Sequence, residues 1–170
     1  MPTLVLTVVG DDRAGLVAAV ADVVDAHGGN WERSQLAELA GTFAGVIEVS
    51  VATDREAELR EALASIDGLL TVAVPAKEQA TDASTSRALA FTVLGNDHPG
   101  IVRDIAAALS AHGVSIDRLT TETRDAAMAG GRLFEATVIA RAPASVDLSA
   151  VTDQLERLAS EIQVDVTVGQ

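Results

Sequence analysis

The sequence predicts an α+β protein built from two copies of one small domain, each with the order strand, helix, strand, strand, helix, strand. Residues 4–38 align with residues 89–123 at an offset of 85 without a gap, and twelve of the 35 positions are identical. Apolar residues also recur in the same order of strand and helix periods in both halves. Between the halves, residues 76–86 (AKEQATDASTS) are polar and aperiodic, which predicts a linker. Self-similarity at a fixed offset indicates a duplicated unit.

The first copy, residues 1–75, begins with the β-branched apolar run Thr3–Val9, which predicts a buried strand. Gly10-Asp11-Asp12 bounds this run and predicts a turn. Apolar residues then follow helical spacing, and Gly28-Gly29 is typical of a helix C-terminus. The residues at this spacing are Leu16, Val20, Val23, Val24 and His27.

The rest of the first copy predicts a hairpin, a second helix and a last strand. Trp31–Leu39 and Thr42–Ala52 flank Ala40-Gly41, an arrangement typical of two antiparallel strands and their turn. Thr53 and Glu56 have the spacing of a capping box and predict a helix start. The inner face of this helix comprises Leu59, Leu63 and Ile66, and the last strand is Leu69–Val74.

The second copy, residues 87–170, repeats the order, with Gly130-Gly131 as the hairpin turn. This order is the split βαβ, or ferredoxin-like, arrangement, so we expect two antiparallel four-stranded sheets, each with its helices on one face. Open edge strands on such small sheets usually pair with another copy, which favours a homodimer, although the two copies of one chain could also pair. The predicted strands are Ala88–Leu94, Val114–Thr123, Arg132–Arg141 and Val164–Val168, and the predicted helices are Gly100–His112 and Leu148–Ile162.

Composition and charge exclude several classes of protein. Hydrophobic residues make up 48% and charged residues 22%, as in folded soluble proteins. A net charge of −13 repels a phosphate backbone, so we expect no direct binding to nucleic acid. The absence of cysteine excludes disulfides, thiolate catalysis and iron–sulfur clusters. No apolar stretch approaches the roughly 18 residues of a membrane span, and no basic leader precedes the first strand, so we expect a cytoplasmic protein with no membrane contact.

The strongest local motif is the turn between the first strand and the first helix of each copy. It reads GDDRAG at residues 10–15 and GNDHPG at residues 95–100. Glycines permit a tight turn and close approach of a ligand, and the N-terminus of the following helix suits a carboxylate. Asp12 and Asp97 could bind an ammonium group, so the turn fits an α-amino acid. The alternative is that these aspartates are only helix N-caps.

These features resemble the ACT domain, a regulatory module that binds amino acids. The resemblance rests on the turn at residues 95–102, on helices that end in His-Gly, and on the segments GNWERSQL (29–36) and VSIDRL (114–119). It covers about 150 of the 170 residues. Two tandem ACT domains with nothing attached are similar to the glycine cleavage system transcriptional repressor family, and NWERSQLAEL (30–39) and APAS (142–145) support this likeness.

The resemblance implies that an amino acid lies between paired modules, held by the first turn and by a polar residue at the start of the second strand. Ala14 and Ser115 depart from the family pattern, which usually has Pro and Asn there, so we expect two unequal sites, of which one could be vestigial. The implied ligand-binding residues are Gly10, Asp11, Asp12, Gly15, Leu16 and Asn30 in the first copy, and Gly95, Asn96, Asp97, Pro99, Gly100, Ile101 and Ser115 in the second.

The sequence offers no candidate for catalysis. It has no Gly-x-Ser-x-Gly elbow, P-loop or His-Glu-x-x-His motif, and Asp165-Val166-Thr167 lacks half of the Asp-x-Asp motif of a phosphatase. His27 and His112 each precede a helix-ending Gly and are expected to complement the helix dipole; a metal site would need further ligands. We therefore expect no catalytic residue, no metal and no cofactor.

The resemblance implies a transcriptional repressor that responds to glycine or a similar small, serine-like amino acid and acts through a protein partner, a DNA-binding activator. Two alternatives remain open. The chain could be a free-standing regulatory subunit of an amino-acid metabolic enzyme, or a truncated relative of ACT-containing enzymes such as formyltetrahydrofolate deformylase.

Overall fold

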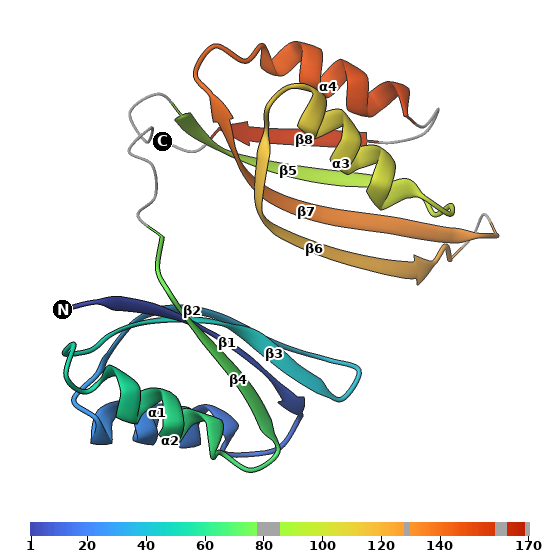
Figure 1. The fold of residues 1–170 in the computed structure, drawn as a ribbon. Helices are drawn as coiled ribbons and strands as arrows, with labels where there is room; N and C mark the ends of the chain where they lie inside the picture. Colours follow the sequence, from blue (N-terminus) through green and yellow to red (C-terminus); the bar gives the residue numbers. More distant parts are fainter. Residues whose placement is uncertain (78–85, 128–129, 159–162, 169–170) are drawn as a thin grey trace. The chain divides into compact units, whose positions relative to one another are not determined.

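A computed structural model describes residues 1–77, 86–127 and 130–158, and the backbone of residues 163–168. The chain forms two compact units, Met1–Glu78 and Gln79–Gln170 (Figure 1). Most of the predicted linker, and residues 159–162 of the last predicted helix, lie outside the described residues. Ser86, the last residue of the predicted linker, already belongs to a strand. Each unit is considered by itself below.

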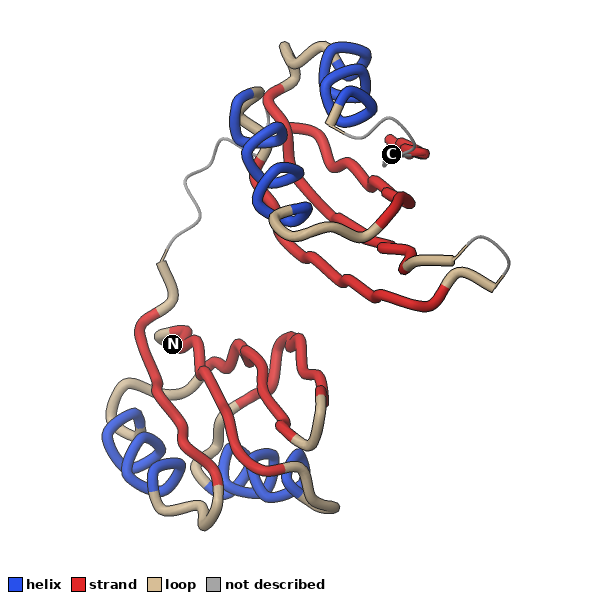
Figure 2. Tube along the Cα trace, turned by 90° about the vertical axis from the view of Figure 1, so that its right-hand side faces the viewer, coloured by secondary structure: helices blue, strands red, loops and turns tan. Residues whose placement is uncertain are grey.

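The first unit has the predicted βαββαβ order and one antiparallel sheet with strand order β2-β3-β1-β4. Both helices cover one face of this sheet (Figure 1, Figure 2). Alternate residues of β1, namely Leu4, Leu6 and Val8, enter the core between sheet and helices. The elements are β1 (Thr3–Asp11), α1 (Leu16–Ala26), β2 (Asn30–Leu39), β3 (Thr42–Ser50), α2 (Glu56–Ala64) and β4 (Leu69–Pro75).

The second unit repeats this architecture with strand order β6-β7-β5-β8. Its core combines Phe91 and Phe134 from the sheet with buried aliphatic residues of both helices, such as Leu109 and Leu155. The elements are β5 (Ser86–Asn96), α3 (Ile101–Ala111), β6 (Ser115–Asp125), β7 (Arg132–Pro143), α4 (Leu148–Arg157) and β8 (Gln163–Val168). The expectation of two tandem ferredoxin-like domains is thus confirmed.

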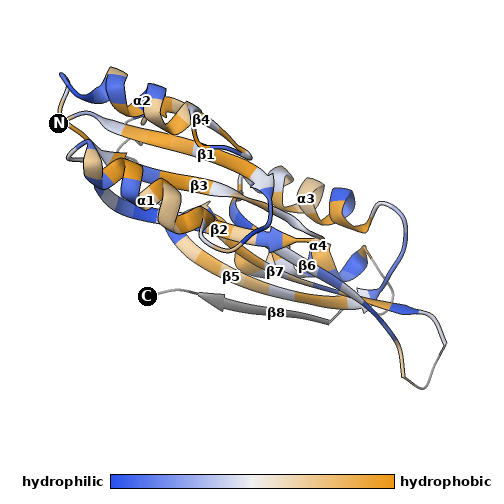
Figure 3. Cartoon of the chain, turned by 90° about the horizontal axis from the view of Figure 1, so that it is seen from below, coloured by the Kyte–Doolittle hydropathy of each residue, from blue (hydrophilic) through white to orange (hydrophobic). Residues whose placement is uncertain are grey.

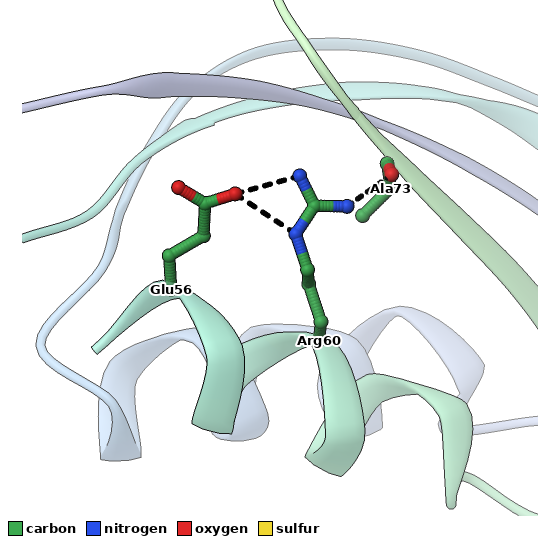
Figure 4. Close-up of polar contacts among 3 residues, drawn as sticks. All are labelled: Glu56, Arg60 and Ala73. Atoms are coloured by element: carbon green, nitrogen blue, oxygen red, sulfur yellow. Dashed lines mark hydrogen bonds and ion pairs between the residues drawn. The ribbon is translucent and has the colours of Figure 1, made fainter. Parts of the chain in front are cut away.

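The predicted capping box at the start of α2 is wrong. The N-cap of α2 is Arg55, which makes no side-chain capping hydrogen bond. The carboxylate of Glu56 instead accepts hydrogen bonds from Nε and Nη2 of Arg60, at 2.9 and 2.7 Å (Figure 4). Arg60 also donates to the backbone carbonyl of Ala73 on β4, so the side chain ties the helix to the edge of the sheet.

The first strand of each unit is longer than predicted. Gly10 and Asp11 pair with Phe43 and Thr42 of β3, so these two residues are strand and not turn. In the second unit β5 likewise extends through Gly95 and Asn96. The partner strands β3 and β7 extend far enough to pair with these residues, and the local sequence does not show this pairing.

Among the described residues, no helix is long and apolar enough to cross a membrane.

Candidate functional site

The loop that follows the first strand is short in both units and ends at a left-handed glycine. It comprises residues 12–15 before α1 and residues 97–100 before α3. Gly15 (φ 90°) and Gly100 (φ 89°) are the N-cap residues, and no side chain caps either helix. The first N–H groups of each helix therefore have no capping side chain. In α3 the N–H of Ile101 donates instead to the backbone carbonyl of His98 at 3.3 Å, which leaves those of Val102 and Arg103 for a ligand. The helix N-terminus also carries a partial positive charge, which suits an anion.

Asp12 and Asp97 are not helix N-caps, so that alternative is wrong. Their backbone N–H groups donate to the carbonyls of Gly41 (2.9 Å) and Arg132 (2.8 Å), which holds the start of each loop against the neighbouring hairpin. Neither carboxylate makes a hydrogen bond or ion pair with any described residue. Asp12 is exposed and Asp97 is half-buried. Both loops thus place an unpartnered carboxylate near an uncapped helix N-terminus.

The two glycines of the first loop motif have different roles. A Cβ atom at Gly10 would lie 2.3 Å from the carbonyl oxygen of Gly68, so packing of the chain itself requires glycine there. A Cβ atom at Gly15 would meet nothing within 4 Å. The space for a ligand expected at these glycines is therefore present at Gly15 and filled at Gly10.

Charged side chains distinguish the two loops. Arg13 donates a hydrogen bond to the backbone carbonyl of Asp67, which ties the first loop to the turn before β4. The imidazole of its counterpart in the second loop, His98, lies 3.2 Å from the carbonyl of the next residue, Pro99. The exposed Arg103, whose guanidinium pairs with Asp104 at 2.9 Å, lies in the first turn of α3.

Sequence reasoning missed Arg103 as a candidate anion-binding residue. The sequence does contain a signal for it, because Arg103 is a cation in the first turn of a helix, a position that normally favours acidic residues. Its counterpart in α1 is Ala18, so only the second copy has this charge at that position.

The polar residue expected at the start of the second strand belongs to a small hydrogen-bonded cluster in the first unit. Asn30 Nδ2 and Ser50 Oγ both donate to Oε1 of Glu32, at 2.9 and 2.6 Å. The hydrogen bond from Ser50, and then that from Asn30, lower the pKa of the Glu32 carboxyl below its ordinary value. The other oxygen, Oε2, has no partner among the described residues. Glu32 sits in a β-bulge of the edge strand β2 and was missed by sequence reasoning.

The second unit fills the same positions with an ion pair. Ser115 and Arg141 face each other in the register as Asn30 and Ser50 do. Arg141 contacts both carboxylate oxygens of Asp117 at 2.8 to 2.9 Å, and this hydrogen bond raises the pKa of the Arg141 guanidinium. The carboxylate is thus neutralised in the second unit and left charged in the first. The two clusters thus differ in charge, and the inequality of the two binding sites stays a prediction.

The structure does not bring the loop and the second-strand cluster of one unit together. Asn30 pairs with Ser50, and Ser50 pairs with Thr3, at the beginning of β1. The loop of residues 12–15 follows Asp11, at the other end of that strand. Eight residue steps of an antiparallel strand span about 27 Å. A ligand that contacts both groups would therefore need two modules.

The histidines contact neighbouring helical residues. His27 Nδ1 lies 2.8 Å from the carbonyl of Val23, in the last turn of α1. His112, at the equivalent position, lies instead 2.7 Å from Oε1 of Gln154 on α4. Within residues 1–77, 86–127 and 130–158, no three His, Cys, Asp or Glu side chains gather as a metal site would require.

Comparison with known proteins shows two matches to the ACT domain, over residues 2–74 and residues 90–160. A crystal structure of an unknown protein from Galdieria sulphuraria aligns with 99% of both chains, at 28% identity and a TM-score of 0.88. A provisionally assigned glycine cleavage system transcriptional repressor aligns over 99% of this chain and 98% of its own, at 18% identity and a TM-score of 0.69. No curated protein matches the sequence.

Proposed function

The chain belongs to the ACT-domain family, with two tandem ACT domains, and from this premise we propose that it is a regulatory protein that binds a small amino acid. Glycine or a serine-like amino acid is the expected ligand. The protein is proposed to act through a protein partner and to have no catalytic activity of its own.

The proposal rests mainly on the loops before α1 and α3. Each loop offers uncapped helix N–H groups for a carboxylate and an unpartnered aspartate, Asp12 or Asp97, for an ammonium group. An α-amino acid carries both charges one carbon apart, and few other small metabolites do. Gly15 leaves open space beside the first loop, which suits a ligand with a small side chain.

The second-strand residues supply the other half of the proposed site. Because Asn30 and Ser115 lie at the far end of the sheet from their own loops, each would meet the loop of a second module. A ligand held by two modules stabilises the arrangement that brings them together. Binding then shifts the population between paired and unpaired modules, and a partner that recognises one arrangement responds to the amino acid.

We extend the proposal to transcription: the chain restrains a DNA-binding activator and does not contact DNA itself. The net charge of −13 supports this, because an acidic surface suits a basic surface on a partner and opposes nucleic acid. The shared fold with the provisionally assigned repressor is compatible with the same role.

A thermal-shift screen of the twenty amino acids, with glycine and serine first, tests the ligand. Glycine has five heavy atoms, so its best binding free energy is about −7.5 kcal/mol and the screen should reach millimolar concentrations. A ligand present at 100 times its dissociation constant adds about 2.7 kcal/mol to stability. We expect a selective rise in Tm with small amino acids. The absence of a shift with every amino acid would refute the proposal.

A pull-down with and without that amino acid tests the partner. Capture of a DNA-binding activator supports the repressor role, whereas capture of a biosynthetic enzyme would replace it with the role of an enzyme's regulatory subunit.

A further inference from the structure

The face of the first sheet that α1 and α2 leave uncovered is apolar. Because Leu4, Leu6 and Val8 enter the core, the intervening residues of β1 and their cross-strand neighbours lie on this outer face. Figure 3 shows β1 hydrophobic along most of its length, as expected of a strand covered on both sides. On β1, β3 and β4, the large apolar residues exposed on this face are Leu70 (64%), Val72 (52%), Val74 (48%), Val46 (43%) and Val9 (37%).

These five residues form one continuous patch, which we call the apolar face. Leu70 pairs with Val9, and Thr7 lies between Val72 and Val46 in the register of three adjacent strands. Val5, Thr7 and Ala44, which separate the five, carry no charge. Glu48 of β3 lies on this face opposite Val5, and its carboxylate pairs with Arg33 of the edge strand β2, so the pair is neutral.

The second domain shows that the fold does not require this pattern. Val46 is replaced by Thr137 at the same register position, and Ala44 by the charged Glu135. At the β8 positions that correspond to Leu70, Val72 and Val74, the residues are Gln163, Asp165 and Thr167. One repeat therefore keeps polar residues where the other keeps large apolar ones. Contiguous exposed apolar patches of this kind mark interaction surfaces.

We propose that the apolar face binds the same face of a second copy of this chain. Charge favours this occupant: two chains of net charge −13 repel each other, and this face, on which the Glu48 carboxylate is paired with Arg33, is a surface on which they can meet with little repulsion. A basic protein partner would instead bind the acidic surface outside the apolar face. A two-fold axis places the patch against itself, and sheets packed face to face in this way align within about 30°.

The size of the apolar face fits a weak dimer. Its three strands, about 4.8 Å apart and about 27 Å long, present roughly 400 Å² per copy, and so about 800 Å² for the pair. Interfaces of this size belong to the weak, transient class, so the test is designed around a dissociation constant in the micromolar range. The inference goes beyond the proposed function, because it holds whether or not an amino acid binds.

Packing through the face differs from the edge-to-edge pairing expected from sequence. On the edge strand β4, Arg60 already donates to the carbonyl of Ala73, an acceptor that an added strand would use (Figure 4). The apolar face includes neither the loop of residues 12–15 nor the Glu32 cluster, so both stay accessible in the dimer.

Sedimentation velocity of the full chain, from about 1 to about 200 µM, tests the proposal across a micromolar dissociation constant. We expect a monomer–dimer equilibrium that Val72→Lys weakens at least tenfold. Leu158→Lys is the matched control: Leu158 is 36% exposed at the C-cap of α4, away from both loops, and the change in charge is the same. We expect the control to dimerise as the wild type does. Thermal melts of both variants verify that they fold.

A crosslinking experiment identifies the face directly, because the chain has no cysteine. Thr7→Cys lies at the centre of the apolar face, and Thr92→Cys is its counterpart in the second domain. With a short bismaleimide, we expect crosslinked dimers of the first variant and far fewer of the second. A monomeric wild type, or a dimer unaffected by Val72→Lys and not crosslinked through residue 7, would overturn the proposal.

Discussion

Replacing Asp97 by Asn should remove most of the affinity for a small amino acid while leaving the fold intact. The side chain is isosteric, and no described residue hydrogen-bonds to the Asp97 carboxylate, so its substitution breaks no internal contact. A hydrogen bond to a charged group contributes about 1.5–3 kcal/mol. At this half-buried position the loss corresponds to about 10- to 100-fold in dissociation constant.

The same change at Asp12 should have a smaller effect. Asp12 is exposed, and exposed ion pairs contribute at most about 1 kcal/mol, or roughly fivefold. Isothermal titration of wild type, Asp97→Asn and Asp12→Asn with glycine gives the comparison. Acetate, which lacks the ammonium group, is the control ligand and should bind neither variant more weakly than the wild type, because each variant has one negative charge fewer. An equal loss for glycine and acetate, or no loss with Asp97→Asn, would refute the assignment of the ammonium partner.

Three further predictions concern stability. Ala40 has a strained φ of 51° in the two-residue β2–β3 turn, a conformation that glycine adopts without strain. Ala40→Gly should therefore stabilise the first domain by about 1 kcal/mol and raise its Tm in calorimetry by about 4–8 °C. An unchanged Tm would argue against strain at this residue. The buried hydroxyl of Thr71 has no hydrogen-bond partner among the described residues, so Thr71→Val should raise the free energy of unfolding in urea by about 1 kcal/mol. A lower free energy of unfolding would show that the hydroxyl has a partner. The folded-state pKa of Glu32 is lowered, so its stabilising effect is complete above about pH 4.5 and is lost as the pH falls through the folded-state pKa. The Tm difference between wild type and Glu32→Gln should therefore shrink between pH 6 and pH 3, and a constant difference would contradict the hydrogen-bonded carboxylate.

Much of the fold could be predicted from the sequence because its signals are local or repeated. The alignment of Leu4–Glu38 with Leu89–Thr123 revealed the duplication, and apolar periodicity located the elements. The ends of elements were harder, since they depend on distant partners. Gly10 and Asp11 look like a turn until β3 is seen to pair with them. Glu56 has the spacing of a capping residue, but the N-cap is Arg55 and the Glu56 carboxylate binds Arg60 instead.

The candidate site was predictable only in part, for the same reason. The loop motif stands out in the sequence, but the choice between N-cap and free carboxylate for Asp12 depends on where the helix begins. Glu32 becomes a candidate only because it accepts a hydrogen bond from Ser50, which lies 18 positions away in the chain but on the neighbouring strand. The separation between the loop and Asn30 follows from strand pairing and not from spacing. The apolar face likewise requires the register of three strands.

The central claim, that the loops before α1 and α3 bind an amino acid, is tested most directly by backbone amide NMR of the full chain titrated with glycine. The account predicts saturable shifts in the first-turn amides of one or both helices, Leu16–Ala18 or Ile101–Arg103, together with Asn30 or Ser115 at the start of a second strand. Acetate alone should perturb the helix amides more weakly. The absence of saturable shifts, or shifts confined to other parts of the molecule, would contradict the account.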